Sequence, residues 1–383
     1  MQKISNQPLA LLNQLTPEAF LAEYWQKKPL LIRQAIPQFE GLLTPDELAG
    51  LACEDEVQSR LVQFIKGQWQ VTQGPMTEKT FKRLPEKDWT LLVQGVNHFL
   101  PEATDLLSQF SFIPHARLDD LMVSYAPDGG GVGPHLDSYD VFLLQGSGKR
   151  HWKISQQTDF TLVENAPLRI LQNFETEQEW VLEAGDMLYL PPQIAHWGVA
   201  VGDDCMTYSI GFRAPKTQEL AHEFLHYLQD QSTLTGIYAD ADLTLQTHPA
   251  EISTAMVEKV YQSFKAITWG TQHVGDFLGR YLTEPKPHIV FEPPKKMSLK
   301  IFGQRLQQRI IYLDLASQML FWQDTFYLNG EALAVPNTLT TEMKILADTR
   351  QLDGSSLEAD QLGTLAALLH PHYLAGYLML EEA

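Results

Sequence analysis

Cysteine is almost absent from this sequence of 383 residues, since Cys53 and Cys205 are the only two. Two thiols so far apart do not make a disulfide framework, which excludes the disulfide-stapled class of secreted domains. No run of eighteen or more apolar, uncharged residues occurs, so we expect no membrane span. The start of the chain, MQKISNQPLALLNQLTPEAF, lacks the basic, apolar and small-residue zones of a signal peptide. These absences predict a soluble protein of the reducing cytoplasm.

Basic residues are scarce as well, because 28 Lys and Arg face 47 Asp and Glu, for a net charge of −19. General nucleic-acid binders use Lys and Arg to displace counterions from phosphates, so we expect no direct DNA binding. A negative field favours encounter with a basic partner. Many acidic proteins have no such partner, so the charge alone identifies none.

The local pattern of apolar, capping and turn residues changes along the sequence and divides the chain into regions. Thr16-Pro17-Glu18 and Thr44-Pro45-Asp46-Glu47 are typical of helix starts. From about Leu121 to Phe212, short apolar runs alternate with Gly- and Pro-rich turns, which predicts an all-β barrel or sandwich.

Helical periodicity resumes after Pro215, in residues 217–231, 254–267 and 274–282. The proline-rich stretch 284–296 is typical of a linker. A helix-like segment and a hairpin signal at Asn329-Gly330 follow, which predicts a small α/β module at the C-terminus.

His135 and Asp137 are two residues apart in GPHLDSYD, and His196 follows the Pro-Pro turn of MLYLPPQIAH. On a β-strand, residues two apart point to the same face, so both side chains of the pair would reach one point. Two imidazoles and one carboxylate favour non-haem Fe(II) and leave positions open for a cosubstrate and O2. An H-x-D alone is more often a solvated turn, but the glycine-rich approach and the second histidine favour a metal site.

A basic pair follows on the next predicted strand, where Arg150 lies fifteen residues after His135. 2-Oxoglutarate chelates iron through one end and needs a cation for its far carboxylate, which a guanidinium binds with two parallel hydrogen bonds. Strand parity does not choose between Lys149 and Arg150, because the Gly146-Ser147-Gly148 turn breaks the count. The spacing favours Arg150, although such pairs are also common at exposed hairpins.

Three stretches, GGGVGPHLDSYDVFLLQGSGKRHW, GDMLYLPPQIAHWG and YSIGFRAP, make the chain resemble the bacterial JmjC-domain ribosomal oxygenases, relatives of the cupin-fold 2-oxoglutarate hydroxylases. The resemblance extends over nearly the whole chain. By position, it makes His135, Asp137 and His196 the iron ligands and Arg150 the 2-oxoglutarate anchor.

The resemblance also implies an α+β architecture. A double-stranded β-helix with N-terminal helices would occupy residues 1–214. A helical dimerisation region would follow at 215–287 and a winged-helix-like domain at 288–383. The implied activity is hydroxylation of an arginine β-carbon in a basic protein of the large ribosomal subunit, the sixteenth, by a homodimer. A histidine or another protein stays open as the target.

Two further site residues are expected with less support from the residues themselves. Ser124, in the predicted strand LMVSY, would present its hydroxyl to the 2-oxoglutarate carboxylate. Asp128, in APDGGG, would pair with a substrate guanidinium, although Pro-Asp-Gly is also a favoured turn sequence.

Two alternatives belong to other functional classes. The stretch from His222 to His226 satisfies the H-E-x-x-H signature of zinc metalloproteases, and both histidines would share one helical face. The apolar stripe of that helix lies opposite, and no clear third ligand follows, so a solvated face is the simpler interpretation. A non-catalytic cupin scaffold is the other alternative, against which the four predicted site residues argue.

Overall fold

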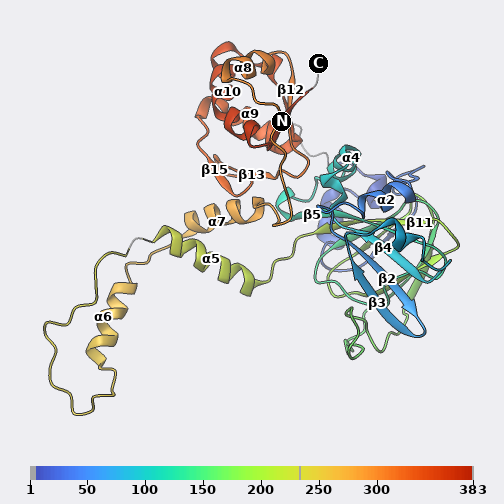
Figure 1. Cartoon of the computed structure of the whole chain (residues 1–383), viewed down its shortest axis with the longest axis horizontal. Coiled ribbons are helices and arrows are strands. Elements are labelled where there is room, and N and C mark those ends of the chain that lie inside the picture. The colour runs from blue at the N-terminus through green and yellow to red at the C-terminus, as the bar shows by residue number, and fades with distance from the viewer. Residues whose placement is uncertain (1–5, 233, 382–383) are drawn as a thin grey trace.

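Two antiparallel sheets in the N-terminal half of the chain face each other and form a barrel (Figure 1). The computed structural model describes residues 6–232 and 234–381. The larger sheet contains, in spatial order, β1 (Leu30–Ile32), β9 (Met187–Leu190), β6 (Val141–Gln145), β11 (Cys205–Phe212), β5 (Leu118–Ala126), β4 (Trp89–Val93), β2 (Ser59–Ile65) and β3 (Gln68–Gln73). The smaller sheet contains β10 (Ala195–Val201), β7 (Lys149–Ser155) and β8 (Gln178–Leu182).

The strands of the larger sheet alternate between two faces, as the pleat requires. Their outward residues join the main core with the N-terminal helices; on β5 these are Leu121 and Val123. Inward residues of β6 and β9 pack instead against Trp152 and Ile154 of the smaller sheet. Because successive side chains point to opposite faces, Asp120, Met122 and Ser124 of β5 face the barrel interior.

The N-terminal helices begin where their capping residues predict. In α1 (Pro17–Glu23), the Thr16 side chain accepts a hydrogen bond from the backbone N–H of Ala19. In α2 (Pro45–Leu51), Thr44 and Glu47 form a capping box. Two further helices, α3 (Glu78–Phe81) and α4 (Pro101–Ser108), complete this layer. Both predicted helix starts and the β-rich region after Leu121 are confirmed.

Three helices follow the barrel, namely α5 (Thr217–Gln231), α6 (Thr254–Phe264) and α7 (Thr271–Thr283). Helix α5 packs along α7, where the Phe224 and Phe277 rings lie 5.4 Å apart. Helix α6 lies at the end of an arm that extends away from the rest of the chain (Figure 1). Residues 284–296 contain no helix or strand, as the proline-rich sequence predicts.

The C-terminal unit, residues 297–381, has its own hydrophobic core of leucine, phenylalanine and methionine side chains. It contains α8 (Leu299–Leu306), β12 (Ile310–Leu313), β13 (Met319–Trp322), β14 (Thr325–Leu328), β15 (Glu331–Leu333), α9 (Thr340–Thr349), β16 (Gln351–Asp353), α10 (Ala359–Leu374) and β17 (Leu378–Leu380). Strands β14 and β15 form the hairpin predicted at Asn329-Gly330, and both turn residues have positive φ.

Helix α7 lies on the sheet β13–β14–β15, and two of its glycines make the close approach possible. A Cβ at Gly275 would lie 2.3 Å from the Trp322 ring, and one at Gly279 would lie 2.3 Å from the Tyr327 ring. The domain boundary expected between residues 287 and 288 stays a prediction. Helix α7 precedes this boundary, yet it packs on β13, β14 and β15, which follow it.

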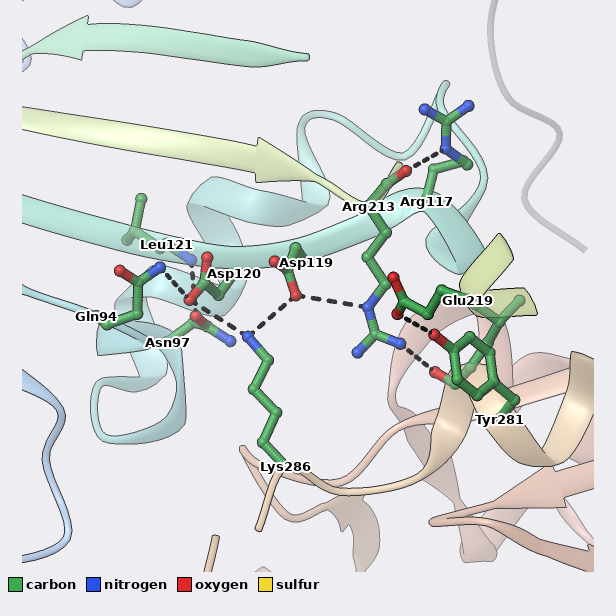
Figure 2. A network of polar contacts seen from close by, with 11 residues as sticks. Gln94, Asn97, Arg117, Asp119, Asp120, Leu121, Arg213, Glu219, Tyr281 and Lys286 are labelled. Carbon is green, nitrogen blue, oxygen red and sulfur yellow. Dashed lines mark hydrogen bonds and ion pairs between the residues drawn. The ribbon is translucent and has the colours of Figure 1, made fainter. Parts of the chain in front are cut away.

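A polar network ties the barrel to the chain that leads into the C-terminal unit (Figure 2). The Lys286 ammonium lies 3.0 Å from an Asp119 carboxylate oxygen and 3.6 Å from one of Asp120. Arg213 lies 3.5 Å from Asp119 and donates to the Leu282 carbonyl at the end of α7. Lys286 and Arg213 thus compensate the negative charges of Asp119 and Asp120 near the start of β5.

We predict that Gly279→Ala destabilises the protein by about 1–3 kcal/mol, because the methyl group overpacks the contact with Tyr327. Gly363→Ala in α10 is the matched control, since a Cβ there meets no atom within 4 Å. The control is expected to be neutral or to stabilise by up to about 1 kcal/mol, the helix-propensity gain of alanine. Urea unfolding of both variants measures the two effects. Equal stability would contradict the close packing of α7.

Candidate metal centre

His135 and Asp137 lie in the connection between β5 and β6, and the strand expected around them is not formed. His135 instead makes an isolated antiparallel bridge with His196 on β10. The two residues exchange both backbone hydrogen bonds, at 3.0 and 2.8 Å. The preceding glycines allow the close approach, because a Cβ at Gly131 would lie 2.5 Å from the Gly198 carbonyl oxygen. The glycine-rich segment follows β10 closely without becoming a regular strand.

Both histidines are held by a backbone carbonyl on the Nδ1 side of the ring. His135 Nδ1 lies 2.9 Å from the Gly133 carbonyl oxygen, and His196 Nδ1 lies 2.9 Å from that of Ile194. A carbonyl oxygen only accepts, so each Nδ1 carries the proton and each Nε2 keeps a free lone pair. Such outer contacts are the usual way to orient a metal-binding imidazole.

The three donor groups converge on one point. One ligand atom from each of His135, Asp137 and His196 lies within 4.8 Å of the other two. His196 Nε2 lies 3.6 Å from an Asp137 oxygen, and the imidazole centroids are 4.2 Å apart. Burial lowers the pKa of His196 to about 4, and the neighbouring His135 contributes to the same shift to a smaller extent. The ring is therefore neutral near pH 7, as a metal ligand must be. Two imidazoles and one carboxylate fit Fe(II).

The structure places Lys149 and Arg150 on opposite faces of β7. Lys149 points outward and pairs with Glu183 at 2.6 Å on the surface. Arg150 is 4% exposed, and its Nε and Nη2 atoms are buried without a hydrogen-bond partner among the described residues. Its third nitrogen, Nη1, donates a long hydrogen bond of 3.5 Å to the Gly198 carbonyl, so the buried charge is poorly compensated and an anionic ligand would satisfy it.

Arg150 and His196 share the inner face of the smaller sheet. Arg150 is paired with Ala200, and Ile154 is paired with His196. Directly opposite residues of an antiparallel pair point to the same side, and so do residues two apart. Four residues of strand separate the two positions, or about 13 Å along β10. Ser124 is buried on β5 and faces the same interior from the larger sheet.

Asp128 is exposed and lies away from His196, at the opposite end of β10. Its carboxylate accepts a hydrogen bond from the backbone N–H of Gly202, just beyond the far end of β10. Gly202 follows His196 by six residues, which corresponds to about 20 Å of extended chain. The role of Asp128 as a substrate contact stays a prediction, and its hydrogen bond to Gly202 joins the loop after β5 to the end of β10.

Sequence reasoning missed Asp120, which is 3% exposed on the same face of β5 as Ser124. Gln94 donates to its carboxylate at 2.7 Å, and Lys286 lies near it (Figure 2). Burial raises the pKa of Asp120, while Lys286 opposes the shift. The period-two spacing of Asp120, Met122 and Ser124 was the signal that could have identified it.

Two family models match the chain. One, described as a JmjC domain, covers residues 105–220 and includes all the predicted site residues. The other, described as a ROXA-like winged helix, covers residues 266–379. The ribosomal protein uL16 3-hydroxylase of Escherichia coli is 34% identical over 362 residues, which are 92% of this chain and 96% of that protein. The chain belongs to the JmjC-domain ribosomal oxygenases.

Solved structures agree with this family. The structure of the E. coli ribosomal oxygenase YcfD matches this chain with a TM-score of 0.80 and 32% sequence identity. The match covers 96% of this chain and 98% of YcfD. A second structure, of YcfD in complex with cobalt and 2-oxoglutarate, gives a TM-score of 0.80 at 33% identity over 95% of this chain and 97% of its own. The expected architecture, a JmjC barrel with a C-terminal winged-helix domain, is confirmed. Among the described helices, none has the length and apolar character needed to cross a bilayer.

Proposed function

We propose that this ribosomal oxygenase is an Fe(II)- and 2-oxoglutarate-dependent protein hydroxylase whose metal is held by His135, Asp137 and His196. The observation that carries the proposal is the convergence of two Nδ1-anchored imidazoles and one carboxylate inside the barrel. When bound, iron with 2-oxoglutarate and O2 supplies the power to insert one oxygen atom into a C–H bond, and 2-oxoglutarate becomes succinate and CO2. The chain itself contributes positioning and shielding.

Arg150 binds the far carboxylate of 2-oxoglutarate in this proposal. Its unpartnered Nε and Nη2 atoms are adjacent donors on one edge of the guanidinium, the arrangement that two carboxylate oxygens match. The Ser124 hydroxyl adds a donor from the facing sheet. Trp152 and Ile154 line the same face of β7, so the bound dicarboxylate is shielded from water.

Arg150→Ala is expected to raise the KM for 2-oxoglutarate at least about tenfold, because hydrogen bonds to charged groups contribute roughly 1.5–3 kcal/mol each. Lys149→Ala is the matched control, since that ammonium pairs with Glu183 on the outer face. Succinate release at varied 2-oxoglutarate concentration measures both. An unchanged KM in Arg150→Ala would move the anchor elsewhere.

The substrate in this proposal is an arginine of a large-subunit ribosomal protein, hydroxylated at its β-carbon. The support is the E. coli relative, which is named for 3-hydroxylation of ribosomal protein uL16 and matches almost end to end. The net charge of −19 suits a basic partner. Asp128 is the predicted contact for the substrate guanidinium, which the substrate KM of an Asp128→Asn variant would test.

Ribosomal protein uL16 incubated with the purified chain, Fe(II) and 2-oxoglutarate is expected to gain the mass of one oxygen atom on one arginine. Fragment-ion mass spectrometry locates the residue and distinguishes arginine from histidine. Asp137→Ala is expected to abolish both this gain and succinate release, because the metal loses its carboxylate. Product formed equally well by Asp137→Ala would rule out the metal centre.

A homodimer through the helical region is part of the same proposal. Within the described chain, α6 buries none of its residues, although Val257, Tyr261 and Phe264 form one apolar stripe at helical spacing. Exposed apolar patches of this kind mark protein–protein contacts. The second copy would cover the stripe, which is exposed among residues 6–232 and 234–381 of a single chain.

Sedimentation of the wild-type chain at micromolar concentration is expected to give the mass of two chains. Replacing Val257 and Tyr261 together with Glu is expected to give the mass of one chain, because the charges replace apolar contacts. Glu258→Lys, on the neighbouring face of α6, is the matched control and should stay dimeric. A wild-type monomer would contradict the dimer.

A further inference from the structure

A second group of metal-ligating side chains lies outside the barrel, on α5. One ligand atom from each of His222, Glu223 and His226 lies within 4.8 Å of the other two. His222 Nδ1 lies 3.3 Å from one Glu223 oxygen, and His226 Nδ1 lies 3.8 Å from the other. The imidazole centroids are 4.3 Å apart. Three donor atoms of two chemical kinds therefore face one point.

The helix itself brings these donors together. Residues four apart are neighbours on an α-helix, so His222 and His226 lie one turn apart on the same face. The opposite face of α5 is anchored on α7, where Leu228 is buried and the Tyr227 hydroxyl donates to Asp276 at 2.9 Å. The backbone beneath the donors is thus fixed, while their side chains are 41–63% exposed to solvent.

The donor set selects the kind of ion. Imidazole nitrogens suit Zn²⁺, Cu²⁺ and Ni²⁺, whereas Mg²⁺ and Ca²⁺ prefer oxygen ligands throughout. Two histidines and one glutamate are also a known zinc ligand set, with the remaining position open to water. We propose that α5 carries a surface site for one divalent transition-metal ion of this class, held by His222, Glu223 and His226.

This site differs from the metalloprotease arrangement that the H-E-x-x-H spacing suggests. In those enzymes the glutamate is the general base, and a further ligand completes the metal site. Here the Glu223 carboxylate lies against both imidazoles and is itself the third donor. The arrangement supports metal binding and leaves no free carboxylate in the motif to activate water, so we assign it no peptidase activity.

The α5 site is also independent of the barrel site. In the barrel, the Nδ1 atoms of both histidines are occupied by backbone carbonyls, and only Nε2 is free. On α5, the Nδ1 atoms themselves face the carboxylate, and His222 Nδ1 is hydrogen-bonded to it, so a bound ion would replace the proton shared there. The two sites share no residue and lie on separate elements, so each can be removed without the other. The α5 site does not rest on the proposed hydroxylase activity.

Calorimetric titration of the metal-free, full-length chain with ZnCl₂ tests the proposal. We expect two Zn²⁺ per chain in the wild type, since zinc also accepts the barrel ligands. Replacing His222 and His226 together with Ala is expected to remove one of the two. His135→Ala is expected to remove the other and to leave the α5 site intact. His248→Ala, an exposed histidine outside both groups, is the control and should bind two.

The identity of the ion and the role of Glu223 have their own readouts. In the His135→Ala variant, only the α5 site remains. It should bind Cu²⁺ more tightly than Ni²⁺ or Zn²⁺, which is the usual order of affinity for nitrogen ligands, and should show no Mg²⁺ binding. Glu223→Gln should weaken Zn²⁺ binding there. A His222/His226 double variant that still binds two Zn²⁺ would overturn the site. Unchanged Zn²⁺ affinity in Glu223→Gln would overturn the three-donor assignment.

Discussion

The two backbone hydrogen bonds between His135 and His196 hold the candidate metal centre together. They fasten an irregular, glycine-rich segment to the start of β10, so that residues 61 positions apart become direct neighbours. Once this pair is formed, the two imidazoles meet at 4.2 Å and the Gly133 and Ile194 carbonyls orient the rings. Asp137 is bound to the same strip of chain, because its carbonyl accepts from the Gln193 N–H. Backbone contacts thus position all three donor residues.

The two faces of the larger sheet have different surroundings. On one side of the larger sheet, leucine, valine and aromatic residues pack against the N-terminal helices. On the other side, β5 presents Asp120 and Ser124 toward the smaller sheet. Arg150 faces this interior with two unpartnered nitrogens, in a position where burial of a charge is tolerated only with a counter-charge. The fold thus places an incompletely hydrogen-bonded guanidinium beside the apolar side chains that join β6 and β9 to the smaller sheet.

The sequence predicted those features whose cause is local. The caps at Thr16 and Thr44 and the Asn329-Gly330 turn depend on a few adjacent residues, and all three form as expected. The metal donors were found as a pattern, yet the strand predicted around them was wrong, because only isolated bridges at Gly131 and His135 join this segment to β10. The sequence pattern did not decide whether Lys149 or Arg150 points into the barrel. The register of β7 with β10 places Arg150 on the inner face and Lys149 on the outer face. The packing of α7 on the C-terminal hairpin depends on partners about 50 residues away, which no periodicity reveals.

Strand β5 is shared between the site and the chain that leads into the winged-helix unit. Near its start, Asp119 and Asp120 hold Lys286, and Asp119 also holds Arg213 (Figure 2). Ser124 lies four residues beyond Asp120 on the same strand, on the face directed toward the barrel interior. The contacts to the chain entering the winged-helix unit and the wall opposite Arg150 thus belong to one strand, which is hydrogen-bonded to β4 and β11 along its two edges.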